Sequence, residues 1–319
     1  MVSLNDIPIS ATSFDSASRP WARFEVDADN ATEALRKAGL DWEVKTEDVK
    51  SEYGVVIPNV KATVRTDLPE ESPDRVLGIV GDRYQPIQNS DALGFVDDLL
   101  AKGGRITHAG PIDNGKRVWM RLQMGDEFGI NGDAYTRQLL AFTGHDGYCM
   151  RSLQAMMLRL ICLNGMMAIS NIAKWTVRHT RYASERVAES NELIMGAEQE
   201  WEQLTSKLRS LIGQPVYARQ YLESVVPPTY IVDKATGLRK IASRGENIRN
   251  RILDRLESSP ALEGHRGDLY GAYQAVAEYA DHDRVMAVNP DKRLKNLWFG
   301  GANQLKTKAL NKALDLVAV

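Results

Sequence analysis

The pattern of apolar and polar positions predicts strands in the first half of the chain and helices in the second. A short helix is expected over residues 31–38, and strand-like segments cover residues 42–44, 55–57, 60–64 and 76–80. Further on, Leu93, Val96, Leu99 and Leu100 recur at helical spacing. This spacing predicts one helix that begins at Ser90 and ends before a pair of glycines.

The strongest local signal is a β-hairpin at Asn114-Gly115. Two strand-like segments, residues 105–112 and 117–124, flank this turn. Asn and Gly tolerate the positive φ angles that tight hairpin turns require. A third strand is expected over residues 138–143, and a long mixed segment follows it as far as residue 175.

From residue 183 onward the pattern is helical. One seam of apolar positions is spaced alternately three and four residues apart; it consists of Val187, Ser190, Ile194, Ala197, Trp201, Leu204, Leu208 and Leu211. Such a seam is typical of an amphipathic helix packed within its own subunit, or of a self-associating coiled coil. More helices are expected over residues 216–224, 246–257 and 268–280.

These elements predict an α+β protein in three parts. Residues 1–30 are expected to form a flexible arm, because they are polar and weakly patterned. Residues 31–182 are expected to form an α+β core with an antiparallel sheet and packed helices. Residues 183–319 are expected to be helical.

Composition narrows the protein class. The 319 residues are 43% hydrophobic and 26% charged, as in ordinary folded proteins. No segment offers the roughly 18 to 20 unbroken apolar residues of a membrane span, and no positive end precedes an apolar run. Two cysteines, Cys149 and Cys162, are too few for a disulfide framework or a four-thiolate zinc site. We therefore expect a cytoplasmic protein without a membrane partner.

The small net charge of −2 hides an asymmetry between the halves. Residues 1–150 contain 16 Lys and Arg against 24 Asp and Glu, a net charge of −8. Residues 151–319 contain 24 against 18, a net charge of +6. The second half can therefore bind phosphate if its cations gather on one surface.

His145-Asp146-Gly147 is the main candidate for catalysis, with His179 further along the chain. A histidine beside an aspartate suits a general base or a metal ligand. The same three residues also suit a tight turn, because Asp bonds its own backbone and Gly takes positive φ. No complete catalytic motif accompanies them. We predict no catalytic residue, no metal and no cofactor.

Three clusters of cations, of which the first and third are mixed with aromatic residues, point to nucleic acid instead. They lie around residues 174–182, 234–251 and 292–299. Cations neutralise phosphates and aromatic rings stack on bases, which is the usual combination for sequence-tolerant binding of single strands. Solvated helix faces or loops are the alternative interpretation.

Several ordered motifs resemble a known family. They are residues 78–89 (GIVGDRYQPIQN), Gly103-Gly104, residues 115–119 (GKRVW), 145–147 (HDG), 159–164 (RLICLN), 178–180 (RHT) and 298–300 (WFG). This set is similar to the phage- and plasmid-related proteins described as domain of unknown function 932, over about residues 31–310. The chain departs from the family where Tyr148-Cys149-Met150 replaces small residues. The resemblance implies a context of mobile genetic elements and no established activity.

A weaker resemblance concerns the order of elements. A helix, three antiparallel strands and then a long helix beginning near Arg151 would resemble the core of single-strand annealing recombinases of the RecT and lambda beta type. That resemblance implies homo-oligomeric rings or filaments that hold DNA in a positive groove, which is an argument from fold alone.

We therefore expect a phage or plasmid protein that binds and anneals single-stranded DNA as a homo-oligomer in homologous recombination. The residues expected to contact nucleic acid are Arg151, Arg159, Lys174, Trp175, Arg178, Arg181, Tyr182, Lys234, Arg239, Lys240 and Arg244. Trp175 and Tyr182 are the stacking candidates among them. The alternatives are a metal-dependent hydrolase or nuclease using His145, Asp146 and His179, and a structural or assembly protein.

Overall fold

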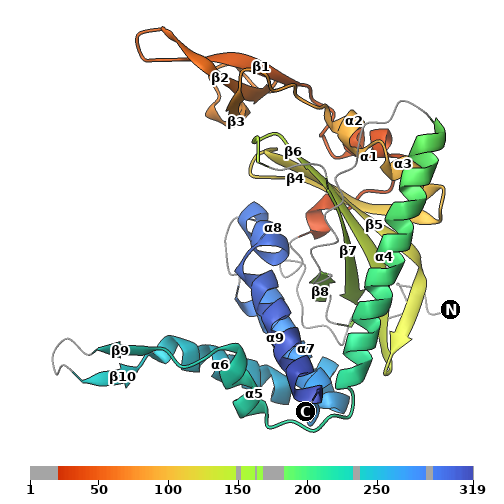
Figure 1. Cartoon of the computed structure of the whole chain (residues 1–319), viewed down its shortest axis with the longest axis vertical. Helices are drawn as coiled ribbons and strands as arrows, with labels where there is room; N and C mark the ends of the chain where they lie inside the picture. Colours follow the sequence, from red (N-terminus) through yellow and green to blue (C-terminus); the bar gives the residue numbers. More distant parts are fainter. Residues whose placement is uncertain are drawn as a thin grey trace.

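The computed structural model describes residues 21–148, 152–161, 164–167, 183–232, 238–284 and 290–318. Antiparallel sheets dominate the first half and helices the second, which confirms the predicted α+β class (Figure 1). None of the helices in these ranges is long and apolar enough to cross a membrane.

A five-stranded antiparallel sheet forms the centre, in the order β4-β5-β6-β7-β8. Its strands are β4 (Gly104–Ile112), β5 (Arg117–Ile130), β6 (Asp133–Gly144), β7 (Ser152–Arg159) and β8 (Asn164–Met167). The hairpin predicted between β4 and β5 is confirmed, and its turn residues Asp113, Asn114 and Gly115 have φ angles of 52°, 58° and 95°. A second Asn-Gly pair, Asn131-Gly132, turns β5 into β6 with φ angles of 50° and 86°.

The long helix expected near Arg151 is wrong, because the chain forms β7 there. Both faces of β7 are buried: Leu153 and Met157 belong to one hydrophobic cluster, and Met156 and Leu158 belong to another on the opposite face. A strand that is apolar on both faces shows no alternation, so its sequence resembles a buried helix. The resemblance to the element order of annealing recombinases therefore extends only as far as β6.

The predicted seam forms one face of α4 (Ala183–Leu211), a helix that runs along the sheet (Figure 1). Its described apolar residues from Leu193 to Leu211 are mostly buried, and the Trp201 Nε1 atom donates to the Met156 carbonyl of β7 at 3.0 Å. This confirms the packing interpretation for the part of the seam from Ile194 to Leu211. Along these positions no exposed stripe is left for a coiled coil.

Shorter helices flank the sheet in the first half. They are α1 (Ala31–Lys37), α2 (Asn89–Leu93) and α3 (Val96–Leu100). Asn30 caps α1, since its side chain accepts a hydrogen bond from the Glu33 amide. The single helix expected from Ser90 is instead split into α2 and α3. Gln88 is at the N-cap position of α2, and its side chain bonds the backbone of Val44 rather than the helix amides.

The second half consists mainly of helices. They are α5 (Ala218–Val225), α6 (Ser243–Ser258), α7 (Leu269–Glu278), α8 (Pro290–Phe299) and α9 (Gly301–Val317), with a 3₁₀-helix η6 (Pro260–His265) and a π-helical turn η7 (Tyr279–Asp283). One hydrophobic cluster extends from Val26 through the sheet to Ala313. The described parts of the predicted core and helical region therefore share one interior.

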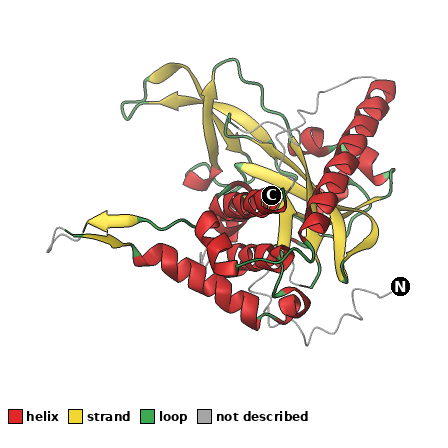
Figure 2. Ribbon diagram, turned by 60° about the horizontal axis from the view of Figure 1, so that its bottom comes forward, coloured by secondary structure: helices red, strands yellow, loops and turns green. Residues whose placement is uncertain are grey.

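Two β elements project from this body. A three-stranded antiparallel sheet in the order β1-β2-β3 contains β1 (Val44–Lys50), β2 (Val56–Arg65) and β3 (Val76–Gly81), with the 3₁₀-turn η4 (Pro73–Arg75) before β3. A hairpin of β9 (Tyr230–Val232) and β10 (Arg239–Ile241) precedes α6 and extends away from the helices (Figure 2).

Part of the predicted flexible arm is packed. Residues 1–20 lie outside the described residues, but Trp21 and Val26 are buried, and the 3₁₀-turn η3 (Ala22–Phe24) lies between them. The Val26 amide donates to the Thr107 carbonyl of β4 at 3.0 Å. Residues 21–30 therefore belong to the body.

Gly78 fixes the three-stranded sheet against the loop after β6. A Cβ atom at position 78 would lie 2.6 Å from the Asp146 Cα atom, whereas nothing lies within 4 Å of one at Gly81. We expect Gly78→Ala to lower the free energy of unfolding by about 1–3 kcal/mol, as overpacking does. Gly81→Ala, the matched control on β3, is expected to change it by less than about 0.5 kcal/mol in urea titrations. Equal effects at the two positions would contradict this contact.

Candidate nucleic-acid interface

The structure describes four of the residues expected to contact nucleic acid. Seven others lie outside the described residues: Arg151, Lys174, Trp175, Arg178, Arg181, Tyr182 and Lys234. Arg239 and Lys240 belong to β10, and Arg244 is in the first turn of α6. Arg159 is at the end of β7.

The prediction that Arg159 contacts nucleic acid is wrong, because its side chain is fully buried. Its guanidinium lies 2.8 Å from Asp133 and 3.7 Å from Glu278, and it donates to the Ala261 carbonyl at 2.6 Å. Arg255 continues this network, since it lies 3.5 Å from Glu278. Arg159 therefore joins the sheet to η6 and α7 and has no access to a phosphate.

The network around Arg159 also orders two tyrosines. The Tyr270 hydroxyl donates to Asp133 at 2.5 Å and lies 2.5 Å from the Tyr135 hydroxyl. Burial is the main cause that raises the pKa of both phenols, so both stay neutral. These groups are interior, and their role is structural.

Helix α6 has two different faces. Ile252 and Leu256 are buried, whereas Arg244 and Arg251 are exposed on another face. These two arginines are seven residues apart, which is about two helical turns, so their side chains lie on one stripe. The exposed face of α6 therefore carries positive charge at two positions that are about two helical turns apart.

This stripe forms one wall of an open cleft of about 680 Å³, which we call the arginine cleft. It is lined by Ser243, Arg244, Asn247, Ile248, Asn250, Arg251, Asp254, Tyr279 and Arg284. Arg244, Arg251 and Arg284 are all exposed to solvent, and Asp254 is the acidic lining residue. The cleft thus has an excess of positive charge.

Arg284 and Tyr279 come from η7 and the residue after it, not from α6. The Arg284 Nη1 atom donates to the Gly301 carbonyl at 2.7 Å, which holds the side chain in place. Burial raises the pKa of the Tyr279 phenol, while the charges of Arg284, Arg251 and Arg244 act in the opposite direction. All three arginines therefore lie near Tyr279, which lines the same cleft.

Asp283, the acidic residue that precedes Arg284 in the sequence, is already engaged. Both carboxylate oxygens of Asp283 accept hydrogen bonds from Arg255 at 2.6 Å. Asp283 is therefore bound to another arginine rather than to the cations of the cleft. A phosphate group fits this arrangement, because guanidinium groups bind it through paired N–H donors and amide side chains add further hydrogen bonds.

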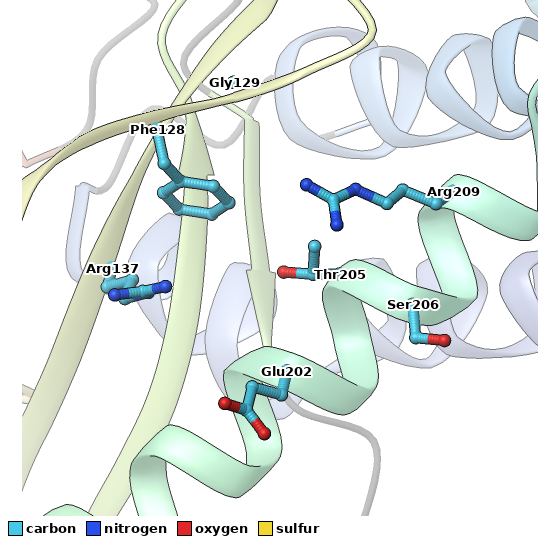
Figure 3. A pocket seen from close by; sticks show the side chains of 7 residues that line it. All are labelled: Phe128, Gly129, Arg137, Glu202, Thr205, Ser206 and Arg209. Carbon is cyan, nitrogen blue, oxygen red and sulfur yellow. The ribbon is translucent and has the colours of Figure 1, made fainter.

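A second open cleft, of about 550 Å³, lies between the sheet and α4. In Figure 3 the Arg209 guanidinium of α4 points towards the ring of Phe128 on β5. The guanidinium of Arg137 lies 5.0 Å from the centre of the same ring. With two arginines and Glu202 among its lining residues, this cleft is less basic than the arginine cleft.

The His145 segment serves the fold. His145 is buried, and its Nε2 atom lies 2.8 Å from the Asn89 Oδ1 atom. Burial lowers the pKa of His145 to about 4, so the ring is neutral at pH 7 and donates to Asn89. Asp146 accepts from the Tyr148 amide at 2.9 Å, as in a tight turn.

Of the three residues of the hydrolase hypothesis, the structure describes two, His145 and Asp146. Within the described ranges no three His, Cys, Asp or Glu side chains gather in a way that could hold a metal ion. His179, the third residue of the hydrolase hypothesis, lies outside these ranges. Asp281, beside His282 in η7, binds Lys306 at 2.6 Å.

Sequence patterns identified only part of the arginine cleft. Arg244 and Arg251 belong to a visible basic cluster, but Tyr279 and Arg284 are brought to it by the packing of η7 against α6. Local sequence patterns do not predict contacts between segments that are far apart in the sequence.

Comparison with known proteins gives one match. Residues 76–298 match the model of a family described as Domain of unknown function (DUF932). Neither the curated proteins nor the solved structures yield a match. Because the matched segment spans more than half of the chain and includes every residue that lines the arginine cleft, the protein belongs to the family described as Domain of unknown function (DUF932).

Proposed function

We propose that the protein binds single-stranded DNA in the arginine cleft and acts without catalysis. The observation that carries this proposal is the convergence of Arg244, Arg251 and Arg284 on one open cleft. Adjacent guanidinium groups suit a chain of phosphates, because each can make paired hydrogen bonds to one phosphate group. Release of counterions from the strand adds to the affinity.

The size and lining of the cleft favour a single strand over a duplex. A volume of about 680 Å³ falls within the range of pockets that enclose small ligands, so a few nucleotides of a flexible strand fit. Duplex DNA is stiff and would meet the cleft only with its outer backbone. The exposed amides of Asn247 and Asn250 can bond the edges of unpaired bases.

The structure gives less support to the two other functions considered, hydrolysis and strand annealing. The hydrolase or nuclease hypothesis depends on His145 and Asp146, whose side chains are bonded within the fold. Strand annealing is not part of this proposal, because β7 replaces the long helix on which the resemblance to annealing proteins depended.

Fluorescence anisotropy tests the proposal with a labelled oligonucleotide of about 16 nucleotides, the upper end of common site sizes. At low salt we expect binding to the single strand, and weaker binding to a duplex of the same length. Absence of binding at low salt, or a preference for the duplex, would contradict the proposal. The duplex serves as the matched control, since it carries more phosphate charge.

A further inference from the structure

Exposed apolar side chains gather on the two projecting β elements. Among the described residues fifteen large hydrophobic side chains are exposed, and eleven of them belong to these elements. We call β9–β10 the ribbon and β1–β3 the sheet arm. Concentrated exposed apolar surface marks an interaction site more often than isolated residues do.

The ribbon is a two-stranded element with both faces in solvent. Tyr230 pairs with Ile241 across the strands, and these side chains are 57% and 50% exposed. The Arg239 guanidinium lies 5.1 Å from the centre of the Tyr230 ring. A hairpin of two strands is marginally stable on its own, and each strand has an edge that the described residues leave unpaired.

The sheet arm offers a matching surface. Val76 and Ile79 of β3 lie opposite Val64 and Ala62 of β2, and they are 40% and 52% exposed. The hairpin tip adds Tyr53, which is 84% exposed. Its outer strands, β1 and β3, each pair with only one strand among the described residues.

The two elements carry opposite charge. Residues 44–81 contain five Lys and Arg against seven Asp and Glu, whereas residues 230–241 contain three against one. Figures 1 and 2 both show the ribbon and the sheet arm leaving the body at separate places. Contact between them therefore requires two copies of the chain. Two ribbons, or two sheet arms, would repel each other.

We propose that the ribbon of one copy docks on the sheet arm of a second copy. Apolar side chains of both elements would be covered, opposite charges would meet, and strand edges could pair. The contact is head-to-tail, so it generates rings when the rotation closes and filaments when it does not. This interface is separate from the arginine cleft, and it goes beyond the proposed binding of DNA.

Paired variants test the interface by light scattering at micromolar concentration. The ribbon variant carries Tyr230→Ser and Ile241→Ser, and the sheet-arm variant carries Val76→Ser and Ile79→Ser. We expect the wild-type protein to have a mass several times 35.6 kDa and each variant to have the mass of one chain. An equimolar mixture of the two variants is expected to form dimers and nothing larger, because one intact contact remains.

The control variant carries Met195→Ser and Leu316→Ser, which are exposed apolar residues outside both elements. It is expected to assemble as the wild-type protein does. A monomeric wild-type protein, an unchanged mass of either variant, or a mixture that stays monomeric would overturn the proposal. A ribbon variant that keeps its mass but loses affinity for the oligonucleotide would show that the ribbon binds DNA instead.

Discussion

Replacing Arg159 by methionine is expected to lower the free energy of unfolding by about 3–5 kcal/mol, because removal of one partner leaves buried charges uncompensated. Asp133 lies 2.8 Å from this guanidinium, and Glu278 is fully buried beside it at 3.7 Å. Arg36→Met, on the exposed surface of α1, is the control, and it is expected to cost less than about 0.5 kcal/mol. Urea titrations measure both.

The pH dependence of this defect gives a second readout. Burial raises the pKa of Glu278 above the ordinary value of 4.5 even with Arg159 in place. Loss of Arg159 raises this pKa further, so the folded variant takes up a proton more readily than the unfolded chain. The defect is therefore expected to shrink as the pH falls from 8 towards 4.5. A cost below about 1 kcal/mol at pH 8 would show that Arg159 is not part of a buried ion network.

Changing Arg244 and Arg251 together to glutamine is expected to weaken binding of single-stranded DNA on the order of 100-fold at low salt. Each lost hydrogen bond between a cation and a phosphate is worth about 1.5 kcal/mol at the lower limit. Both side chains are exposed, so the fold is expected to be unchanged. Arg36→Gln combined with Lys102→Gln, which also removes two positive charges but from exposed positions outside α6, serves as the control. Equal losses in the two proteins would indicate a nonspecific effect of charge.

Local sequence patterns predicted the elements that depend on turn residues, capping residues or one solvent-facing side. The hairpin at Asn114-Gly115 depends on positive φ angles that few residues adopt, and the helix α1 begins at a capping asparagine. The strand β7 was missed, because it is buried on both faces and the alternation that reveals a strand is absent. Periodicity indicates which side of an element meets water, and β7 has no such side.

The candidate site was less predictable than the fold. The sequence shows the charge of a basic residue but not its partner. Arg159 was therefore predicted to contact phosphate, although its acidic partners, Asp133 and Glu278, lie elsewhere in the chain. Conversely, Arg284 lies outside the basic clusters and still lines the arginine cleft. Both differences arise from contacts between distant segments, which local patterns do not encode.

The salt dependence of binding tests the central claim most directly, when wild-type protein and the Arg244→Gln, Arg251→Gln variant are compared by anisotropy. For single strands the slope of log affinity against log salt is about −0.7 for each phosphate that is neutralised. We predict a steep negative slope for the wild-type protein, reduced in magnitude by about 1.4 in the double variant because two phosphate contacts are lost. Equal slopes in the two proteins would contradict the assignment of DNA binding to the arginine cleft.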